Sequence, residues 1–150
     1  MDSGELKVLH YRRARFATQL PLEYLYTPAH YWLGRSGDTW RIGLTKFATR
    51  LLGETVDYGI EAKPGAHLVA GQVIGWIEGF KAVSELLCIA EGKFAGGNAA
   101  LEHDLILVNR DPYGAGWLYG VEGKPDPTCV PVEAYARILD QTIDALIQKG

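Results

Sequence analysis

One lysine between two apolar runs in the middle of the chain is the residue best placed to carry chemistry. Lys81 follows the run at residues 73–79 and precedes the run at 83–89. Valine, isoleucine and tryptophan are enriched in strands, and Gly79 permits a tight reversal of the backbone. The pattern predicts a β-hairpin with Lys81 at its tip. A lysine at a hairpin tip is most often a solvated charge, so the local pattern alone assigns no reaction to it.

Other side chains that could do chemistry are scattered along the chain. The four histidines lack metal-ligand spacing, and there is no phosphate-binding loop, dinucleotide fingerprint or G-x-S-x-G motif. Cys88 and Cys129 are too few for a zinc site, and Cys88, within an apolar run, is expected to be buried. No nucleophile, base and oxyanion donors occur together, so an enzyme stays possible but has no positive evidence. A protein that presents one reactive group to partner enzymes needs none of this machinery.

The composition fits one β-rich domain. The chain has 150 residues, and its 18 glycines and seven prolines suit many short strands and turns better than a helical bundle. The net charge of −3 argues against nucleic-acid binding, and no apolar run is long enough to cross a membrane. The arginine cluster at residues 12–15 is read as a solvated face. The absence of a secretory signal and the low cysteine use make the cytoplasm the expected location.

Three parts are expected along the chain. Residues 1–25 form an N-terminal arm of weak pattern, 26–128 a β domain, and 129–150 a C-terminal helix packed on that domain. The helix is predicted from apolar residues at three- and four-residue spacing, namely Val132, Tyr135, Ile138, Leu139, Thr142, Ile143, Leu146 and Ile147. This apolar stripe is expected to cover the β core.

Periodicity and capping residues predict elements within the β domain. Alternating apolar residues predict strands at 39–44 and 56–60. A short helix is expected between a Thr45 cap and Gly53, with three apolar side chains facing inward: Phe47, Leu51 and Leu52. One helical turn is expected after Asn98, and a loop at 109–116.

Several motifs along residues 26–135 resemble the glycine cleavage system H protein family. The hairpin carries Glu78-x-x-Lys81-Ala82-x-Ser84, and a longer match is Val108-Asn109-x-Asp111-Pro112-Tyr113-Gly114-x-Gly116-Trp117-Leu118. Shorter matches include Tyr26-Thr27-x-x-His30-x-Trp32, Gly43-Leu44-Thr45 and Asn98-x-Ala100-Leu101. The resemblance implies an all-β barrel-sandwich hybrid made of two small antiparallel sheets.

The resemblance also implies lipoate in amide linkage on Lys81, flanked by Glu78, Phe80, Ala82 and Glu85. Acylation removes the ammonium charge, and the dithiolane supplies thiol–disulfide exchange at the end of a long tether. The implied partners are a lipoate ligase or lipoyl transferase and a dihydrolipoamide dehydrogenase. The carrier is expected to be a monomer.

Departures from the family pattern resemble a sister group, the lipoate-binding proteins of heterodisulfide-reductase-like sulfur oxidation. Tyr31 stands where the family has an acidic residue, Phe80 stands where it has an aliphatic one, residues 88–91 differ, and the arm is long. These features, with Gly96-Gly97-Asn98, imply an arm that carries sulfur intermediates for the sulfur-oxidising complex.

Two alternatives remain beside that interpretation. One is glycine cleavage, in which the arm would carry an aminomethyl group between glycine decarboxylase and aminomethyltransferase. The other is an unlipoylated scaffold or regulatory subunit, against which the retention of Lys81 counts. A biotin carrier is disfavoured, because that family has Met on both sides of its lysine and the neighbours here are Phe80 and Ala82.

Overall fold

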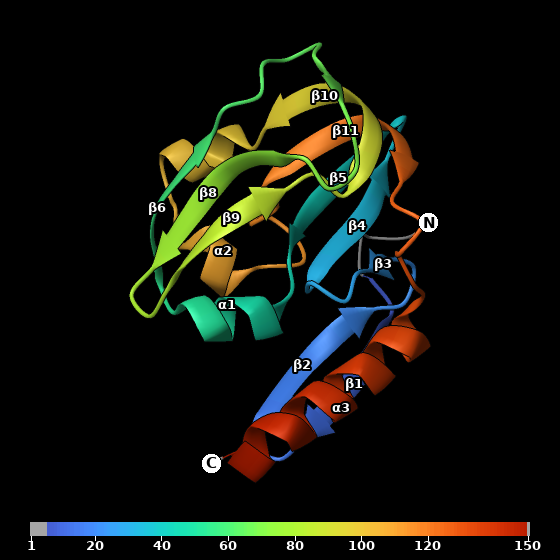
Figure 1. The fold of residues 1–150 in the computed structure, drawn as a ribbon, viewed down its shortest axis with the longest axis vertical. Helices are drawn as coiled ribbons and strands as arrows, with labels where there is room; N and C mark the ends of the chain where they lie inside the picture. The colour runs from blue at the N-terminus through green and yellow to red at the C-terminus, as the bar shows by residue number, and fades with distance from the viewer. Residues whose placement is uncertain (1–5, 150) are drawn as a thin grey trace.

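Two antiparallel sheets share one core in the computed structural model, which describes residues 6–149 (Figure 1). The larger sheet has the strand order β3-β4-β5-β11-β10-β7, and the smaller has the order β6-β8-β9. The strands of the larger sheet are β3 (Leu25–Tyr26), β4 (Tyr31–Ser36), β5 (Thr39–Leu44), β7 (His67–Leu68), β10 (Ala90–Gly97) and β11 (Tyr119–Pro125). Those of the smaller sheet are β6 (Thr55–Ile60), β8 (Val73–Gly79) and β9 (Val83–Leu87). The predicted all-β class is therefore confirmed.

The core between these sheets is built from side chains at alternate positions along the strands, which point inward. Ile42 and Val121 from the larger sheet join Ile77 and Leu86 from the smaller one, and all four are fully buried. Burying a side chain of this kind stabilises the fold by about 1.5–3 kcal/mol. Cys88 belongs to the same core, as its apolar neighbours predicted.

Helix α1 (Lys46–Leu52) begins and ends at the predicted residues. The Thr45 hydroxyl accepts a hydrogen bond from the Ala48 N–H, and Gly53 ends the helix with a positive φ of 80°. Leu52 is buried, but the inward position predicted for Leu51 is wrong, because this side chain is 49% exposed. Successive residues differ by about a quarter turn around a helix, so Leu51 falls on the outer face.

Two further short helices follow β10. The 3-10 helix η1 (Ala99–Glu102) starts after Asn98, whose side chain accepts from the Ala100 N–H, as the sequence predicted. Helix α2 (Leu107–Arg110) occupies the start of the segment predicted to be a loop. Four residues are too few for periodicity to reveal this helix.

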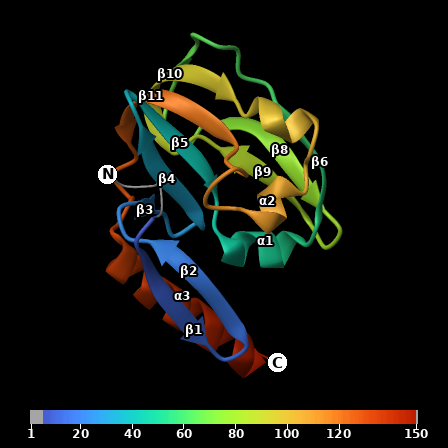
Figure 2. The ribbon, with the colours of Figure 1, turned by 180° about the vertical axis from the view of Figure 1, so that it is seen from behind.

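The first two strands and the last helix of the described residues form a separate layer beneath the sheets. Strands β1 (Val8–Arg13) and β2 (Phe16–Pro21) pair antiparallel, and helix α3 (Val132–Lys149) lies along them (Figure 2). The weak pattern of this N-terminal region predicted no strands, but the structure forms two there. The alternation covers only six residues in each strand, and the Ala14-Arg15 turn interrupts it, so the pattern is faint in the sequence.

A second hydrophobic cluster joins this layer to the edge of the larger sheet. Tyr11 and Leu20 of the hairpin, Trp32 of β4, and Leu139 and Ile143 of α3 are all buried in it. Helix α3 therefore packs on the hairpin and on this edge of the larger sheet, and its buried side chains do not belong to the core between the two sheets. Its last apolar residues, Leu146 and Ile147, extend beyond the cluster and are 50% and 57% exposed.

Polar contacts also connect β1 to α3. The Arg13 guanidinium donates two hydrogen bonds of 2.8 Å to the Asp144 carboxylate, and the Tyr11 hydroxyl donates one to Asp140. The arginine cluster is thus partly engaged and is not simply a solvated face. No helix within residues 6–149 has the length and apolar character needed to cross a membrane.

Candidate functional site

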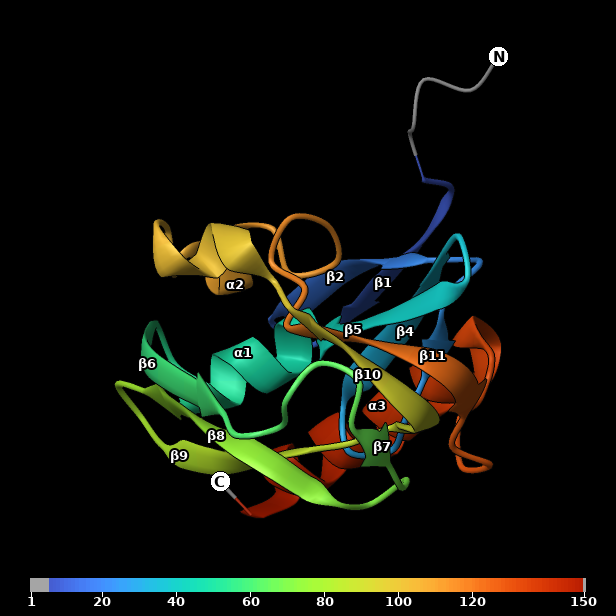
Figure 3. The ribbon, with the colours of Figure 1, turned by 90° about the horizontal axis from the view of Figure 1, so that it is seen from above.

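Lys81 lies at the tip of the β8–β9 hairpin, as the sequence predicted. The Gly79 N–H donates to the Ala82 carbonyl oxygen at 2.9 Å and closes the turn. The Lys81 side chain is exposed. In Figures 1 and 3 the tip lies beside α1, at the end of the smaller sheet. The tip therefore combines a fixed backbone with an accessible amine.

The tip is held by the C-terminal end of α1. The Lys81 N–H donates to the Leu52 carbonyl oxygen at 2.8 Å, and the Phe80 N–H donates to that of Glu54 at 3.1 Å. The Lys81 ammonium group, at Nζ, donates to the Arg50 carbonyl oxygen at 3.2 Å. Carbonyl groups in the last turn of a helix lack partners within the helix and attract cations. The hairpin tip supplies these partners.

This close approach depends on glycine at two positions. A Cβ at Gly79 would collide with the Leu52 carbonyl oxygen, and one at Gly53 would lie 3.0 Å from Lys81 Cγ. Gly53 also has a positive φ, which other residues adopt at a cost. The two glycines therefore set how closely the tip and the helix end approach each other.

The four residues predicted to flank the attachment site lie on the surface of the same hairpin. Glu78, Phe80, Ala82 and Glu85 are all exposed, and Phe80 is 75% exposed. Within residues 6–149, neither glutamate forms an ion pair with Lys81. The expected role of the two glutamates in orienting the tip for a ligase stays a prediction.

A cavity of about 180 Å³ lies between α1 and β9, the two elements adjoining the tip. Its walls are mostly apolar, and it is lined by Ala29, His30, Tyr31, Leu44, Ala48, Leu51, Leu52, Ile77, Ser84, Glu85 and Leu87. Tyr31 is buried, and its hydroxyl accepts from the Leu87 N–H at 3.0 Å. Burial raises the pKa of Tyr31, so the phenol stays neutral at pH 7. The cavity thus offers an apolar space beside Lys81 with polar groups at its edges.

His30 is a polar cavity residue that the sequence did not single out as a site. Its Nδ1 lies 2.8 Å from the Tyr135 hydroxyl on α3. Burial lowers the pKa of His30 to about 4, so the imidazole is neutral at pH 7. The motif containing His30 was visible in the sequence, but the partner 105 residues away was not.

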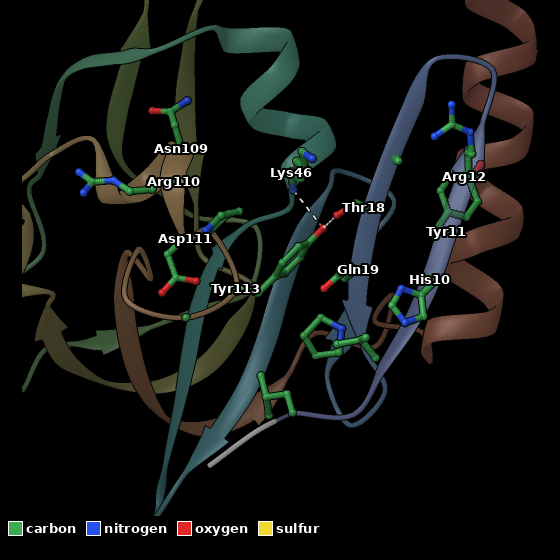
Figure 4. Close-up of a pocket in the computed structure, with 16 residues that line it drawn as sticks. His10, Tyr11, Arg12, Thr18, Gln19, Lys46, Asn109, Arg110, Asp111 and Tyr113 are labelled. Carbon is green, nitrogen blue, oxygen red and sulfur yellow. Dashed lines mark hydrogen bonds between the residues drawn. The ribbon is translucent and has the colours of Figure 1, made fainter. Parts of the chain in front are cut away.

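A larger groove of about 670 Å³ lies elsewhere, between the β1–β2 hairpin and the segment 109–114 (Figure 4). At its base, the Tyr113 hydroxyl lies 2.9 Å from Thr18 Oγ1 and accepts from the Lys46 N–H. The groove is lined by no residue of β8 or β9, so it is separate from the Lys81 site. Within residues 6–149, no three His, Cys, Asp or Glu residues form a group that could hold a metal ion.

Comparison with known proteins assigns a family to this arrangement. The sequence pattern of the family described as Glycine cleavage H-protein matches residues 24–132, which include both sheets and the Lys81 hairpin. The chain belongs to the glycine cleavage H-protein family. Proteins of the H-protein family are lipoyl carriers that hold lipoate covalently on a lysine and work with partner enzymes.

Individual relatives agree with this assignment. The glycine cleavage system H protein of Corynebacterium jeikeium (strain K411) is 36% identical over 122 residues, covering 79% of this chain and 95% of the relative. That of Mycobacterium avium (strain 104) is 42% identical over 106 residues, covering 70% and 80%. The crystal structure of an H protein from Mycobacterium marinum matches with a TM-score of 0.69 at 32% identity, covering 78% of this chain and 96% of that one. This match confirms the predicted barrel-sandwich fold.

The interpretation as a sulfur-oxidation carrier is wrong, because these relatives are glycine cleavage system H proteins. The features that suggested it have local explanations in the fold. Phe80 is exposed, so the fold does not constrain its type. Gly96 lies at a bulge in β10 with a φ of 110°, and Asn98 caps η1. Tyr31 connects β4 to β9 through its hydroxyl. Local contacts therefore account for these residue types without reference to a sulfur cargo.

Proposed function

We propose that this chain is the lipoyl carrier of glycine cleavage, with lipoate attached to the Nζ atom of Lys81. In this role it receives an aminomethyl group from glycine decarboxylase and presents it to aminomethyltransferase. A lipoate ligase or lipoyl transferase attaches the cofactor, and a dihydrolipoamide dehydrogenase reoxidises it. The relatives named as glycine cleavage system H proteins support this role.

The observation that carries the proposal is the position of Lys81. Its backbone N–H is fixed to Leu52, while its side chain is exposed at the end of a hairpin that can enter another protein's cleft. Lys93 offers no such geometry, because it lies within β10 and opposite Glu122 of β11. A carrier needs an attachment residue whose backbone is fixed and whose side chain partner enzymes can reach.

The surroundings of Lys81 fit an acylated side chain. Lipoate supplies a disulfide that accepts the carried group and thiols that are reoxidised afterwards. Acylation removes the charge that the end of α1 attracts through the Arg50 carbonyl oxygen, and so weakens this contact. The cavity between α1 and β9 then gives the uncharged arm an apolar surface on which to fold back.

The test is the exchange of bicarbonate with the glycine carboxyl group, catalysed by glycine decarboxylase in the presence of the lipoylated chain. We expect an exchange rate comparable with that of an H protein from a curated relative at equal lipoyl occupancy. Lys81→Arg should abolish the exchange, and Lys93→Arg should not. A fully lipoylated chain that supports no exchange, or exchange that survives Lys81→Arg, would refute the proposed function.

A further inference from the structure

One face of the β1–β2 hairpin is left open by α3. Tyr11 and Leu20 are buried against α3 in the second hydrophobic cluster. Because successive side chains of a strand point to opposite faces, the residues between them point away from α3. On that open face lie three cross-strand pairs, Val8 with Pro21, His10 with Gln19 and Arg12 with Ala17. All six line the groove of about 670 Å³ between the hairpin and the segment 109–114 (Figure 4).

The two walls of this groove come from different parts of the chain. One is the hairpin, and the other is the segment 109–114 together with Lys46 at the start of α1. The Tyr113 hydroxyl joins the walls, since it lies 2.9 Å from Thr18 Oγ1 and accepts from the Lys46 N–H. The family match begins at residue 24, so it includes the second wall and not the hairpin. The groove therefore needs residues outside the region matched by the family.

Positive charge prevails on the walls of the groove. Arg12, Lys46 and Arg110 line it, and Asp111 is the one carboxylate among the described residues that do so. The Asp111 carboxylate accepts a backbone N–H, and Arg110 pairs with Asp104 outside the groove. Within residues 6–149, Arg12 and Lys46 form no ion pair. The whole chain has 15 Lys and Arg against 18 Asp and Glu, so this positive excess is local and favours an acidic ligand.

Apolar side chains also line the groove. Val8, Ala17 and Pro21 come from the hairpin, and Pro112 comes from the opposite wall. A nucleic acid would use the cations and leave these side chains unused, and the net charge of −3 would repel its phosphates. A peptide that carries both carboxylates and apolar side chains would use both kinds of group. The lining therefore favours a protein segment as the ligand.

The edges of the hairpin offer backbone groups to such a segment. The Leu22 N–H donates to the Lys7 carbonyl oxygen, so these two residues form a hydrogen-bonded pair. Bonded and non-bonded pairs alternate along an antiparallel hairpin, so His10 and Gln19 form a non-bonded pair whose N–H and C=O groups point outward. Within residues 6–149 these outward groups have no backbone partner. An extended segment can pair with such an edge.

The groove is also held at a fixed position relative to the hairpin tip that carries Lys81. Asn109, which lines the groove, donates from Nδ2 to the Gly53 carbonyl oxygen at 3.1 Å. Its Oδ1 accepts from the Thr55 N–H at 2.9 Å. Gly53 follows Leu52, whose carbonyl oxygen accepts from the Lys81 N–H. A protein bound in the groove therefore meets the lysine in a defined geometry.

We propose that this groove docks an extended, acidic segment of an enzyme that acts on the Lys81 arm. Carboxylates of the segment pair with Arg12 and Lys46, and its apolar side chains pack on Val8 and Ala17. The enzyme is then held beside the tip while Lys81 stays free to enter its active site, which raises the effective concentration of the arm. The inference rests on the proposed function through the role of Lys81, but the groove itself can be tested in a chain without lipoate.

The first measurement uses a blocked hexapeptide of alternating glutamate and valine, added to the unlipoylated chain and followed by ¹H–¹⁵N NMR shifts. We expect the shifts to gather at residues 8–21 and 109–114. Arg12→Glu and Lys46→Glu should each weaken binding about fivefold, because attraction is replaced by repulsion at a surface charge pair. Lys46→Glu places an acid in the first turn of α1, where the fold tolerates it. Lys63→Glu, in an exposed turn outside the groove, is the matched control and should bind like the wild type.

Two further probes define the ligand. A hexapeptide of alternating lysine and valine should not bind, and a short single-stranded DNA should bind more weakly than the acidic peptide. Tighter binding of the DNA would overturn the proposed protein ligand. Shifts spread over the whole surface, or peptide binding that Arg12→Glu leaves unchanged, would overturn the docking site.

The second measurement is the steady-state kinetics of each enzyme that acts on the arm, with the carrier as the varied substrate. These enzymes are the lipoylating enzyme, glycine decarboxylase, aminomethyltransferase and dihydrolipoamide dehydrogenase. The double variant Arg12→Glu with Lys46→Glu should raise the KM of at least one of them about tenfold or more, with a smaller change in kcat. Arg12→Lys, which keeps the charge, should stay close to the wild type, and so should Lys63→Glu.

The outcomes distinguish this inference from the function on which it rests. A double variant with the wild-type KM for all four enzymes would overturn the inference alone. An equal rise in KM for Lys63→Glu would indicate a general effect of charge and would also overturn it. A wild-type chain that glycine decarboxylase cannot use overturns the proposed function alone, because peptide binding and the kinetics of lipoylation still decide the inference.

Discussion

The backbone N–H of Lys81 donates a hydrogen bond to the carbonyl oxygen of Leu52, 2.8 Å away, at the end of α1. The helix end and the hairpin tip thus satisfy each other's polar groups. The contact fixes the backbone of the lysine and leaves its side chain exposed. A modifying enzyme therefore meets the same tip geometry in each molecule.

The first prediction concerns the glycine that permits this contact. Gly79→Ala places a methyl group against the Leu52 carbonyl oxygen, so the tip must move away from α1. We expect the free energy of unfolding to fall by about 1–3 kcal/mol and lipoylation to slow. Urea denaturation and a mass-spectrometric time course measure these effects. Gly97→Ala is the control, because its Cβ would meet only ordinary contacts at 3.5 and 3.6 Å. Wild-type stability and lipoylation in Gly79→Ala would contradict the prediction.

The second prediction concerns the attachment residue. Lys81→Arg should abolish the mass gain of one lipoyl group when the chain is coexpressed with a lipoylation system. Since the side chain is exposed, the free energy of unfolding should change by no more than about 0.5 kcal/mol. Lys93→Arg should leave the mass gain intact. A lipoyl group found on Lys93, or on the Lys81→Arg variant, would show that the attachment site is elsewhere.

The third prediction concerns a buried and an exposed position on the apolar stripe of α3. Ile143→Asp puts a carboxylate into the second hydrophobic cluster and should destabilise the fold by several kcal/mol. Leu146→Asp, on the same stripe but 50% exposed, should have little effect. Thermal melts of both variants provide the comparison. If the two variants melt alike, α3 is not packed as described.

The fourth prediction concerns the pH dependence of stability. The folded-state pKa of His30 is about 4, below the ordinary value of 6.5, so between these values the unfolded chain binds the proton and the folded chain does not. Stability should be fully present above about pH 6.5 and fall as the pH drops to 4, by up to about 3 kcal/mol.

Urea denaturation at several pH values tests this contribution. His30→Asn should remove it, so the difference in unfolding free energy between the two proteins should shrink or change sign from pH 7 to pH 4. His10→Asn, which alters an exposed histidine, should keep the wild-type pH dependence. A constant difference between wild type and His30→Asn would contradict the prediction.

Local sequence signals predicted the elements near Lys81 because their causes are local. The period of two in β5, the Thr45 cap and the reversal at Gly79 each depend on a few neighbouring residues. The β1–β2 hairpin escaped prediction because its partner, α3, lies at the other end of the sequence. Its apolar face packs against α3 in the second hydrophobic cluster. The hydrogen bond from Tyr11 to Asp140 likewise joins residues that are 129 apart in the sequence.

Local sequence signals likewise predicted one part of the site, the attachment lysine, and missed the parts that depend on distant residues. Lys81 stood out through its hairpin and motif, but the cavity beside it combines residues from three separate regions of the chain. The bond between His30 and Tyr135 spans 105 residues, so no spacing rule could reveal it. The wrong choice between carried groups came from giving weight to Phe80 and Gly96-Gly97-Asn98, which reflect exposure, a bulge and a cap.

The packing of β1 and β2 on α3 has a consequence for synthesis on the ribosome. The hairpin leaves the exit tunnel before the two sheets, and the helix that covers Tyr11, Phe16 and Leu20 leaves it after them. Domains form as units during translation, and segments that must wait for distant partners expose apolar surface meanwhile. The region matched by the family, residues 24–132, contains both sheets and emerges between these events. The carrier domain can therefore assemble while the first strands of the nascent chain still await their covering helix.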